Sequence, residues 1–341
     1  MSERHAKNSR HALVSMAHSS LPGHGPLWRE LRRIWLALRS ARRWLYVTDL
    51  RAYRAELRRQ QAWNSEGSQL TGSVLNVVAH PDDDLLFLSP DLAGAIRTGV
   101  PVTTIFLTSG DGGRASSYWK EREEGIRRAY AVMAGLPNVW QEATVRLNGR
   151  SLVTAALVGH RSVCLAFLRL PDGLQSGGSS VAPKTTLQML YQGEVVSLLA
   201  VDGATTYSRQ GLIDTIRELA SHCQAEEICT QDYLLPEPHP RFGNLVPDHR
   251  DHLAAARFAY EAHLAYERPH RLLGYAGYGI SSRPRNVYGD EWDAKLAAFS
   301  AYAAHDDQVN PSSRDYRTWC AREYRVGSES GWDPALRSQA W

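Results

Sequence analysis

A short apolar segment that ends in a cluster of ionisable residues most constrains the fold of this chain. Val74–Ala79 is mostly apolar and rich in β-branched residues, which predicts a buried strand. Pro81 ends the hydrogen-bonding ladder because proline has no N–H to donate. In an open α/β sheet, ligands bind at the carboxyl ends of the strands. The groups that follow this strand are therefore expected at a functional site.

Four ionisable side chains follow within five positions, namely His80, Asp82, Asp83 and Asp84. Three adjacent carboxylates repel one another unless a cation, a proton or water separates them. A solvated acidic turn is one interpretation of such a run. The histidine directly after a buried strand favours another, because imidazole and carboxylate groups together are a common ligand set for zinc.

A second ionisable cluster, His249-Arg-Asp-His252, stands at the predicted start of a helix. His249 and His252 are three positions apart and so share a helix face, with Asp251 beside them. Asp248 is expected to cap the helix. A helix start whose Asp and His residues serve only as caps is the alternative interpretation.

One metal ion held between the two clusters would account for both. A catalytic zinc needs about three protein ligands and an open position for water, and His80, Asp83 and His252 would supply them. The metal lowers the pKa of bound water, and a nearby carboxylate accepts the proton; Asp82 is the carboxylate next to a ligand. A protonated His249 could donate to the leaving group or stabilise the oxyanion.

Composition excludes several other classes of protein. The net charge of +3 over 341 residues gives no case for nucleic-acid binding. The four cysteines fit neither a zinc knuckle nor a disulfide scaffold, which predicts free thiols and a reducing, cytoplasmic location. The chain contains no run of 18 apolar residues, so no transmembrane helix is predicted. It has no uninterrupted apolar segment near its start, so no signal peptide is predicted.

The first 72 residues differ in composition and hydrophobic pattern from the rest of the chain. Residues 1–25 are predicted to be disordered. Residues 26–72 are predicted to form a basic amphipathic helical extension followed by a polar linker. The Trp/Leu face of the helix within 26–63 would pack on the protein's own domain, or alternatively lie on an anionic membrane surface or partner.

Strands and helices alternate from residue 73, which predicts an α/β domain over 73–326. A segment at 144–205 has short β-like runs separated by Gly, Ser and Pro, and is predicted to be an insertion over the sheet that carries a lid or substrate loop. Residues 327–341 are predicted to be a flexible tail. The remaining predicted strands are 102–108, 227–230 and 270–278, and the predicted helices are 92–98, 119–134, 210–222 and 292–303.

Together, Ala79-His-Pro-Asp-Asp83 and His249-Arg-Asp-His252 resemble the paired motifs of the PIG-L/LmbE family of zinc-dependent de-N-acetylases. The resemblance covers about residues 74 to 325. Further matching segments are Thr108–Gly113, Arg122–Glu124, Leu168–Gly173 and Ala301–Asp306.

The resemblance implies a Rossmann-like three-layer α/β sandwich with a mainly parallel sheet that binds no nucleotide. It implies Zn²⁺ as the cofactor and Asp82 as the general base. His249 and Asp251 match the other polar positions of the second motif, and Arg122 matches a substrate-binding arginine. The metal ligands that it implies are His80, Asp83 and His252.

Two positions depart from the family pattern. Asp84 stands where the first motif usually ends in glutamate, and a change limited to packing or hydrogen bonding is expected there. Pro247 stands where some members have a mobile tyrosine, so this loop offers no tyrosine for oxyanion stabilisation.

The predicted function is removal of an N-acetyl or longer N-acyl group from an amino sugar conjugate. A non-catalytic glycan-binding module is one alternative, and a membrane-surface docking protein led by residues 26–63 is another. The sugar's partner is left open among inositol, thiol precursor, glycopeptide and lipid conjugates. The sequence does not set the oligomeric state.

Overall fold

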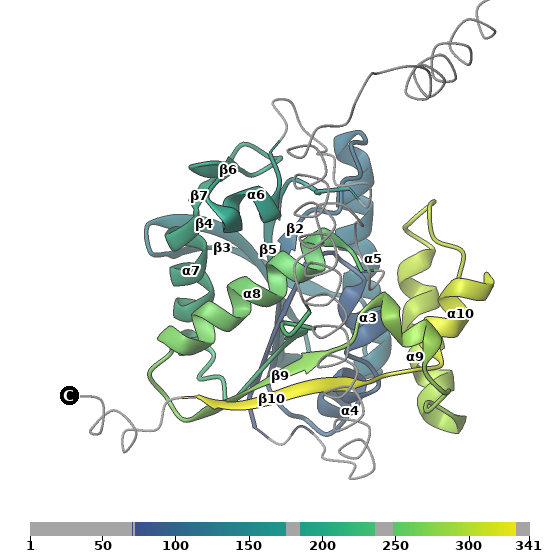
Figure 1. The fold of residues 1–341 in the computed structure, drawn as a ribbon. Coiled ribbons are helices and arrows are strands. Elements are labelled where there is room, and N and C mark those ends of the chain that lie inside the picture. Colours follow the sequence, from purple (N-terminus) through teal and green to yellow (C-terminus); the bar gives the residue numbers. More distant parts are fainter. Residues whose placement is uncertain (1–69, 71, 175–184, 236–247, 332–341) are drawn as a thin grey trace, which may run out of the picture. The chain divides into compact units, whose positions relative to one another are not determined.

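A mixed eight-stranded sheet runs through the part of the chain that the computed structural model describes, which is residues 70, 72–174, 185–235 and 248–331 (Figure 1). The strand order is β10-β9-β8-β1-β2-β5-β4-β3. Strands β9, β8, β1, β2 and β5 run parallel, while β10 and the β3–β4 pair are antiparallel additions at the two edges. The strands of this sheet are β1 (Val74–Val78), β2 (Val102–Thr108), β3 (Trp140–Leu147), β4 (Arg150–Leu157), β5 (His160–Leu170), β8 (Glu227–Gln231), β9 (His270–Tyr275) and β10 (Arg325–Gly331).

Helices cover both faces of the sheet and make three layers (Figure 1). One face carries α6 (Leu187–Gln192), α7 (Arg209–His222) and α8 (Arg250–Ala265), together with the small β6–β7 hairpin (Ser197–Leu199 and Thr206–Ser208). The other side of the molecule carries α3 (Asp83–Phe87), α4 (Asp91–Arg97), α5 (Ser116–Ala134), η1 (Tyr278–Ser282), α9 (Gly289–Ala303) and α10 (Arg314–Cys320).

The side-chain alternation of β1 shows how the layers are joined. Leu75 and Val77 enter the apolar core beneath α7 and α8, whereas Asn76 points to the opposite face, as successive strand residues must. There Asn76 donates to Thr104 of β2 at 2.9 Å, and Thr104 lies 2.5 Å from the hydroxyl of Tyr130 on α5. Because both faces are buried, every residue of β1 is buried.

The predicted three-layer α/β sandwich with a mainly parallel sheet is confirmed. The strand at 102–108 has the predicted bounds, and the first strand ends one residue early, at Val78. All four cysteines are unpaired, as expected. No helix among the described residues is long and apolar enough to cross a membrane.

Two boundaries were predicted wrongly. The segment 144–205 does not lie wholly over the sheet, because β4 and β5 within it are strands of the sheet and β5 pairs in parallel with β2. The flexible tail was predicted to start at 327, but residues 327–331 belong to β10, which pairs with β9 through its backbone. The predictions for 1–25, for the helix within 26–63 and for the loop 175–184 fall outside the described residues.

A buried histidine pair joins the end of α8 to the start of β9. His263 Nδ1 lies 2.8 Å from His270 Nε2, and His270 Nδ1 lies 2.6 Å from the carbonyl oxygen of Arg268. Because a carbonyl only accepts, His270 carries its proton on Nδ1 and accepts at Nε2 from His263. Burial lowers the pKa of His263 to about 4, aided by His270, and burial also lowers the pKa of His270.

This pair predicts a loss of stability in mild acid. An unfolded histidine binds a proton near its ordinary pKa of 6.5, whereas folded His263 resists until about pH 4, so the unfolded state takes up more protons between these values. The free energy of unfolding should therefore fall as the pH drops from 6.5 towards 4. Denaturant titrations between about pH 5 and pH 7 should show a smaller fall for His263→Gln than for the unchanged protein. Equal falls in the two proteins would contradict this account.

Candidate metal centre and active site

The first ionisable cluster lies in the turn that joins β1 to α3. The backbone N–H groups of Asp82 and Asp83 both donate back to the carbonyl oxygen of His80, at 2.9 and 3.3 Å. This tight turn places His80 after the strand and Asp83 at the start of the helix. The second cluster begins α8, which packs against β1. The two segments therefore meet at the carboxyl end of the central strand, as the sequence predicted.

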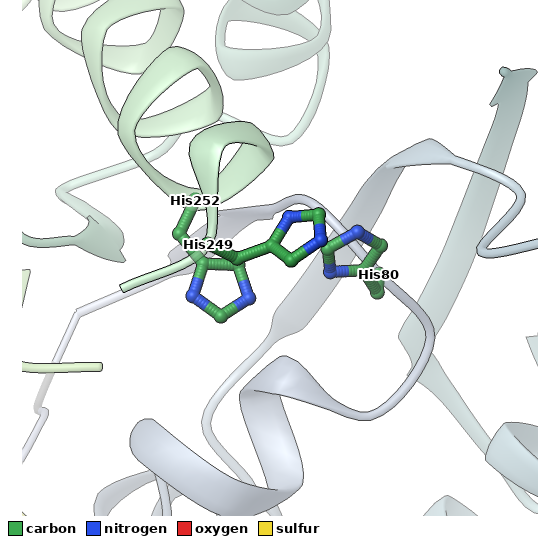
Figure 2. A group of neighbouring side chains, drawn as sticks. All are labelled: His80, His249 and His252. Atoms are coloured by element: carbon green, nitrogen blue, oxygen red, sulfur yellow. The ribbon is translucent and has the colours of Figure 1, made fainter. Parts of the chain in front are cut away.

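Three imidazole rings gather where the segments meet (Figure 2). The centroid of His80 lies 4.6 Å from that of His249 and 5.3 Å from that of His252, and His249 and His252 are 5.4 Å apart. All three are buried, and one nitrogen of each lies within 4.8 Å of the others. A second such group joins His80 to the carboxylates of Asp172 and Asp251.

Asp83 sits between two of these rings. Its Oδ2 accepts from the backbone N–H of His80 at 2.6 Å and lies 3.2 Å from His80 Nδ1, while its Oδ1 lies 2.9 Å from His252 Nε2. Burial alone would raise the pKa of Asp83, but the two facing imidazoles hold it well below its usual range. An anionic carboxylate between two imidazoles is a donor set suited to a divalent metal ion.

Two buried nitrogens have the environment of metal ligands. His80 Nε2 and His252 Nε2 make no hydrogen bond within the described part of the chain, although buried polar atoms are normally paired. His252 Nδ1 lies 2.6 Å from Asp248 Oδ1, which holds a proton on Nδ1, so a neutral His252 would offer the lone pair of its Nε2 to a metal ion. His252 Nε2 approaches Asp83 without the alignment of a hydrogen bond. A cation shared by these atoms would satisfy them.

Asp248 does not cap α8, contrary to the sequence-based expectation. The N-cap residue is His249, whose Nδ1 accepts from the backbone N–H of Asp251 at 3.2 Å. Asp248 contacts His252 instead, one helical turn further along the chain, and this contact replaces its preference for capping. Burial lowers the pKa of His249 to about 3, aided by His80. His249 is therefore a neutral imidazole with its proton on Nε2, and not the protonated donor considered from the sequence.

Asp251 and the end of β5 complete the site on its other side. Asp251 Oδ2 accepts from the backbone N–H of Gly173 at 2.7 Å and lies 3.4 Å from His80 Nε2. Asp172 Oδ2 lies 4.0 Å from the same nitrogen. A Cβ at position 173 would collide with the Asp251 carboxylate, so the close approach requires glycine there. Asp172 had no role assigned from the sequence, although its segment was among the matching motifs.

The other two carboxylates of the first cluster face α5. Asp82 Oδ1 pairs with Arg122 Nη2 at 2.9 Å, and burial raises the pKa of Asp82 to about 6 against the opposing charge of Arg122. Asp84 Oδ2 accepts from the Tyr130 hydroxyl at 2.5 Å, and burial raises the pKa of Asp84 to about 7. The Asp84 carboxylate is therefore engaged by Tyr130 on α5.

Two other ionisable residues, His305 and Asp307, have partners outside the group of imidazoles. His305 Nδ1 contacts Glu121 at 2.8 Å, and the exposed Asp307 pairs with Arg114 at 2.9 Å. Neither residue belongs to a group of metal-ligand type among the described residues.

Comparison with known families gives a match over the central part of the chain. The family model described as GlcNAc-PI de-N-acetylase, PIG-L, matches residues 75–263, which is more than half of the chain. The match includes both ionisable clusters. A search of the curated proteins found no match.

Three of the solved structures that are similar to this chain share 14% to 19% sequence identity with it. N,N'-diacetylchitobiose deacetylase from Pyrococcus horikoshii is 14% identical, covering 78% of this chain and 85% of its own, with a TM-score of 0.43. The zinc-inhibited form of teicoplanin deacetylase Orf2 is 14% identical, covering 72% and 88%, with a TM-score of 0.41. A conserved protein from Thermus thermophilus is 19% identical, covering 76% and 94%, with a TM-score of 0.39.

The site geometry predicts which histidines hold a metal ion. We expect the purified protein to contain a divalent ion by elemental analysis. We expect His80→Ala and His252→Ala to lose most of it, because each removes a buried nitrogen that makes no hydrogen bond to the described residues. His305→Ala is the matched control and should keep its metal, since that ring pairs with Glu121. Full metal occupancy in His80→Ala would contradict the assignment.

Proposed function

Because the chain belongs to the PIG-L family of de-N-acetylases, we propose that it is a metal-dependent hydrolase that removes an N-acetyl group from an amino sugar conjugate. The observation that carries the proposal is the buried meeting of His80, Asp83 and His252 at the carboxyl end of β1. We assign these three residues as the ligands of Zn²⁺. When bound, the ion supplies a Lewis acid for the amide carbonyl and lowers the pKa of a water molecule.

Asp82 is the proposed general base. Its Oδ1 is held by Arg122, while no hydrogen bond to the described residues engages its Oδ2, so that oxygen can accept a proton from water. A pKa of about 6 places the carboxylate near the range in which a base works well at neutral pH. Its neighbour Asp83 faces the imidazoles instead, so the two adjacent carboxylates can take different roles.

His249 and Asp251 are proposed to act together beside the reacting amide. The Nδ1 of His249 accepts from the backbone of Asp251, so its Nε2–H is available to hydrogen-bond a developing oxyanion. Asp251 holds the other side of the site through Gly173 and His80. Water attacks the amide carbon and forms the new C–O bond while Asp82 takes its proton; Asp82 then passes that proton to the nitrogen, the C–N bond breaks, and acetate and the free amine leave. These roles are those of an amidase, and the family to which the chain belongs supports an N-acetylated amino sugar as the substrate.

The proposed activity is tested by amine release. Incubation with N-acetylglucosamine and its alkyl and aryl glycosides should release acetate and primary amine in equal amounts. A chelator should abolish the release and added Zn²⁺ should restore it, because the site depends on a metal ion. A non-catalytic glycan-binding protein would bind such glycosides without producing amine. Amine release that is insensitive to chelator would exclude the proposed mechanism.

The two adjacent aspartates should respond differently to the same substitution. Asp82→Asn keeps the shape of the side chain but cannot take a proton, so turnover should fall by roughly two to four orders of magnitude while metal content stays unchanged. Asp83→Asn replaces an anionic ligand by a neutral amide and should weaken metal binding itself. Turnover and metal content are measured on both variants, and added Zn²⁺ should restore part of the activity of Asp83→Asn only. The opposite pattern would exchange the two roles.

A further inference from the structure

The guanidinium of Arg122 is held by the protein through all three of its nitrogens. Nη2 donates to Asp82 Oδ1 at 2.9 Å, Nη1 donates to the carbonyl oxygen of Gly110 at 2.6 Å, and Nε donates to the hydroxyl of Tyr302 at 2.6 Å. The side chain is buried. A planar group fixed on three sides has one orientation, and here that orientation points Nη2 at the proposed base.

Tyr302 and Asp306, which have no role assigned so far, contact the Nε of the Arg122 guanidinium. Asp306 Oδ2 lies 3.1 Å from Arg122 Nε and accepts from the Tyr302 hydroxyl at 2.7 Å. Asp306 Oδ1 accepts from the Tyr118 hydroxyl at 2.8 Å and from the backbone N–H of Gln308 at 3.0 Å. Asp306 is thus buried, accepts from three donors and lies beside the Arg122 guanidinium. It gives Arg122 a second negative partner opposite Asp82.

Two glycines allow this arrangement to form. Gly110 has a φ of 61°, and a Cβ there would collide with the Arg122 guanidinium. Gly125 on α5 lets α9 approach closely, since a Cβ would come within 2.8 Å of the carbonyl oxygen of Tyr302. Arg122 and Gly125 lie one helical turn apart, so the close approach of the helices brings Tyr302 to the guanidinium. Gly110, in the loop that follows β2, therefore permits the close contact with the Arg122 guanidinium.

The arrangement gives Arg122 a positioning role. Three of its five N–H donors, one on each nitrogen, are committed to protein oxygens, so the group is held in place before any substrate arrives. A buried arginine between two carboxylates is also balanced in charge, so an added anionic substrate group would have to displace one of them. Removing Asp306 would leave Arg122 with Asp82 as its only carboxylate and free the guanidinium to turn.

We propose that Tyr302 and Asp306 are positioning residues that hold Arg122 against Asp82, and so fix the carboxylate that takes the proton from water. Oδ1 of Asp82 stays bound to the guanidinium, and Oδ2 keeps one direction towards the reacting water. This inference rests on the proposed hydrolysis, and it assigns Arg122 a role in the orientation of the base. It predicts that changes far from the substrate alter turnover and leave substrate affinity intact.

Single substitutions in the outer pair test the first part of the proposal. Asp306→Asn keeps the size of the side chain and removes its charge, and kcat should fall by about 10- to 100-fold with KM and metal content unchanged. Asp307→Asn is the matched control, because the carboxylate of Asp307 is exposed and pairs with Arg114. The kcat of this variant should equal that of the unchanged protein. A rise in KM with kcat preserved would show that Arg122 binds substrate, and would overturn the proposal.

A double-substitution cycle separates action through Asp82 from a general structural effect. If Asp306 acts through Asp82, then adding Asp306→Asn to Asp82→Asn should cause no further loss of kcat, because the base is already absent. Losses that multiply in the double variant would overturn the proposal. If Asp306→Asn fails to fold, Tyr302→Phe removes a single hydroxyl and is used in the same cycle. A wild-type protein that releases no amine would refute the proposed function itself, whereas an active wild type with a normal Asp306→Asn variant would refute only this inference.

Discussion

The contact of Asp83 with two imidazoles is the interaction on which the site depends. It joins the end of β1 to the start of α8, two segments that are distant in sequence, and it does so where both are buried. A carboxylate in such a place must be paired, because an isolated buried charge is strongly destabilising. We propose the same atoms as the ligands of a divalent ion. The residues that join the end of β1 to the start of α8 are thus the residues that the proposed chemistry needs.

The sequence predicted the centre of the site because its chemistry is concentrated in two short segments. His80, Asp83 and His252 stand in dense clusters that lie next to a predicted strand and a predicted helix. Asp172 was missed for the opposite reason, since it is a single carboxylate in a segment interpreted as an insertion. Only the parallel pairing of β5 with β2 shows that this segment ends at the same edge of the sheet. Pairing between strands is a non-local property that composition does not reveal.

The wrong predictions share a physical cause. Asp248 is a favourable residue for a helix cap, but in the folded chain its carboxylate fixes the tautomer of His252 and the neighbouring His249 makes the cap. Residues 327–331 have the polar, glycine-containing sequence of a tail, yet they pair with β9 because an edge strand is held mainly by its backbone. In both cases a specific contact outweighs a general residue preference; the contact lies within one helical turn for Asp248 and between two strands for residues 327–331.

Three adjacent carboxylates can coexist after β1 because the fold sends each one to a different partner. Asp82 pairs with Arg122, Asp83 lies between imidazoles from the β1 end and α8, and Asp84 accepts from Tyr130. These partners come from both helical layers, so neither layer alone could neutralise the motif. The Asp-Asp-Asp run is therefore compatible with burial only in a sheet that is covered on both faces. The partner on α5 in turn depends on α9, through the hydroxyl of Tyr302. The charge pattern of three consecutive residues thus links the central strand to three helices, and this is why the motif constrains the architecture as well as the chemistry.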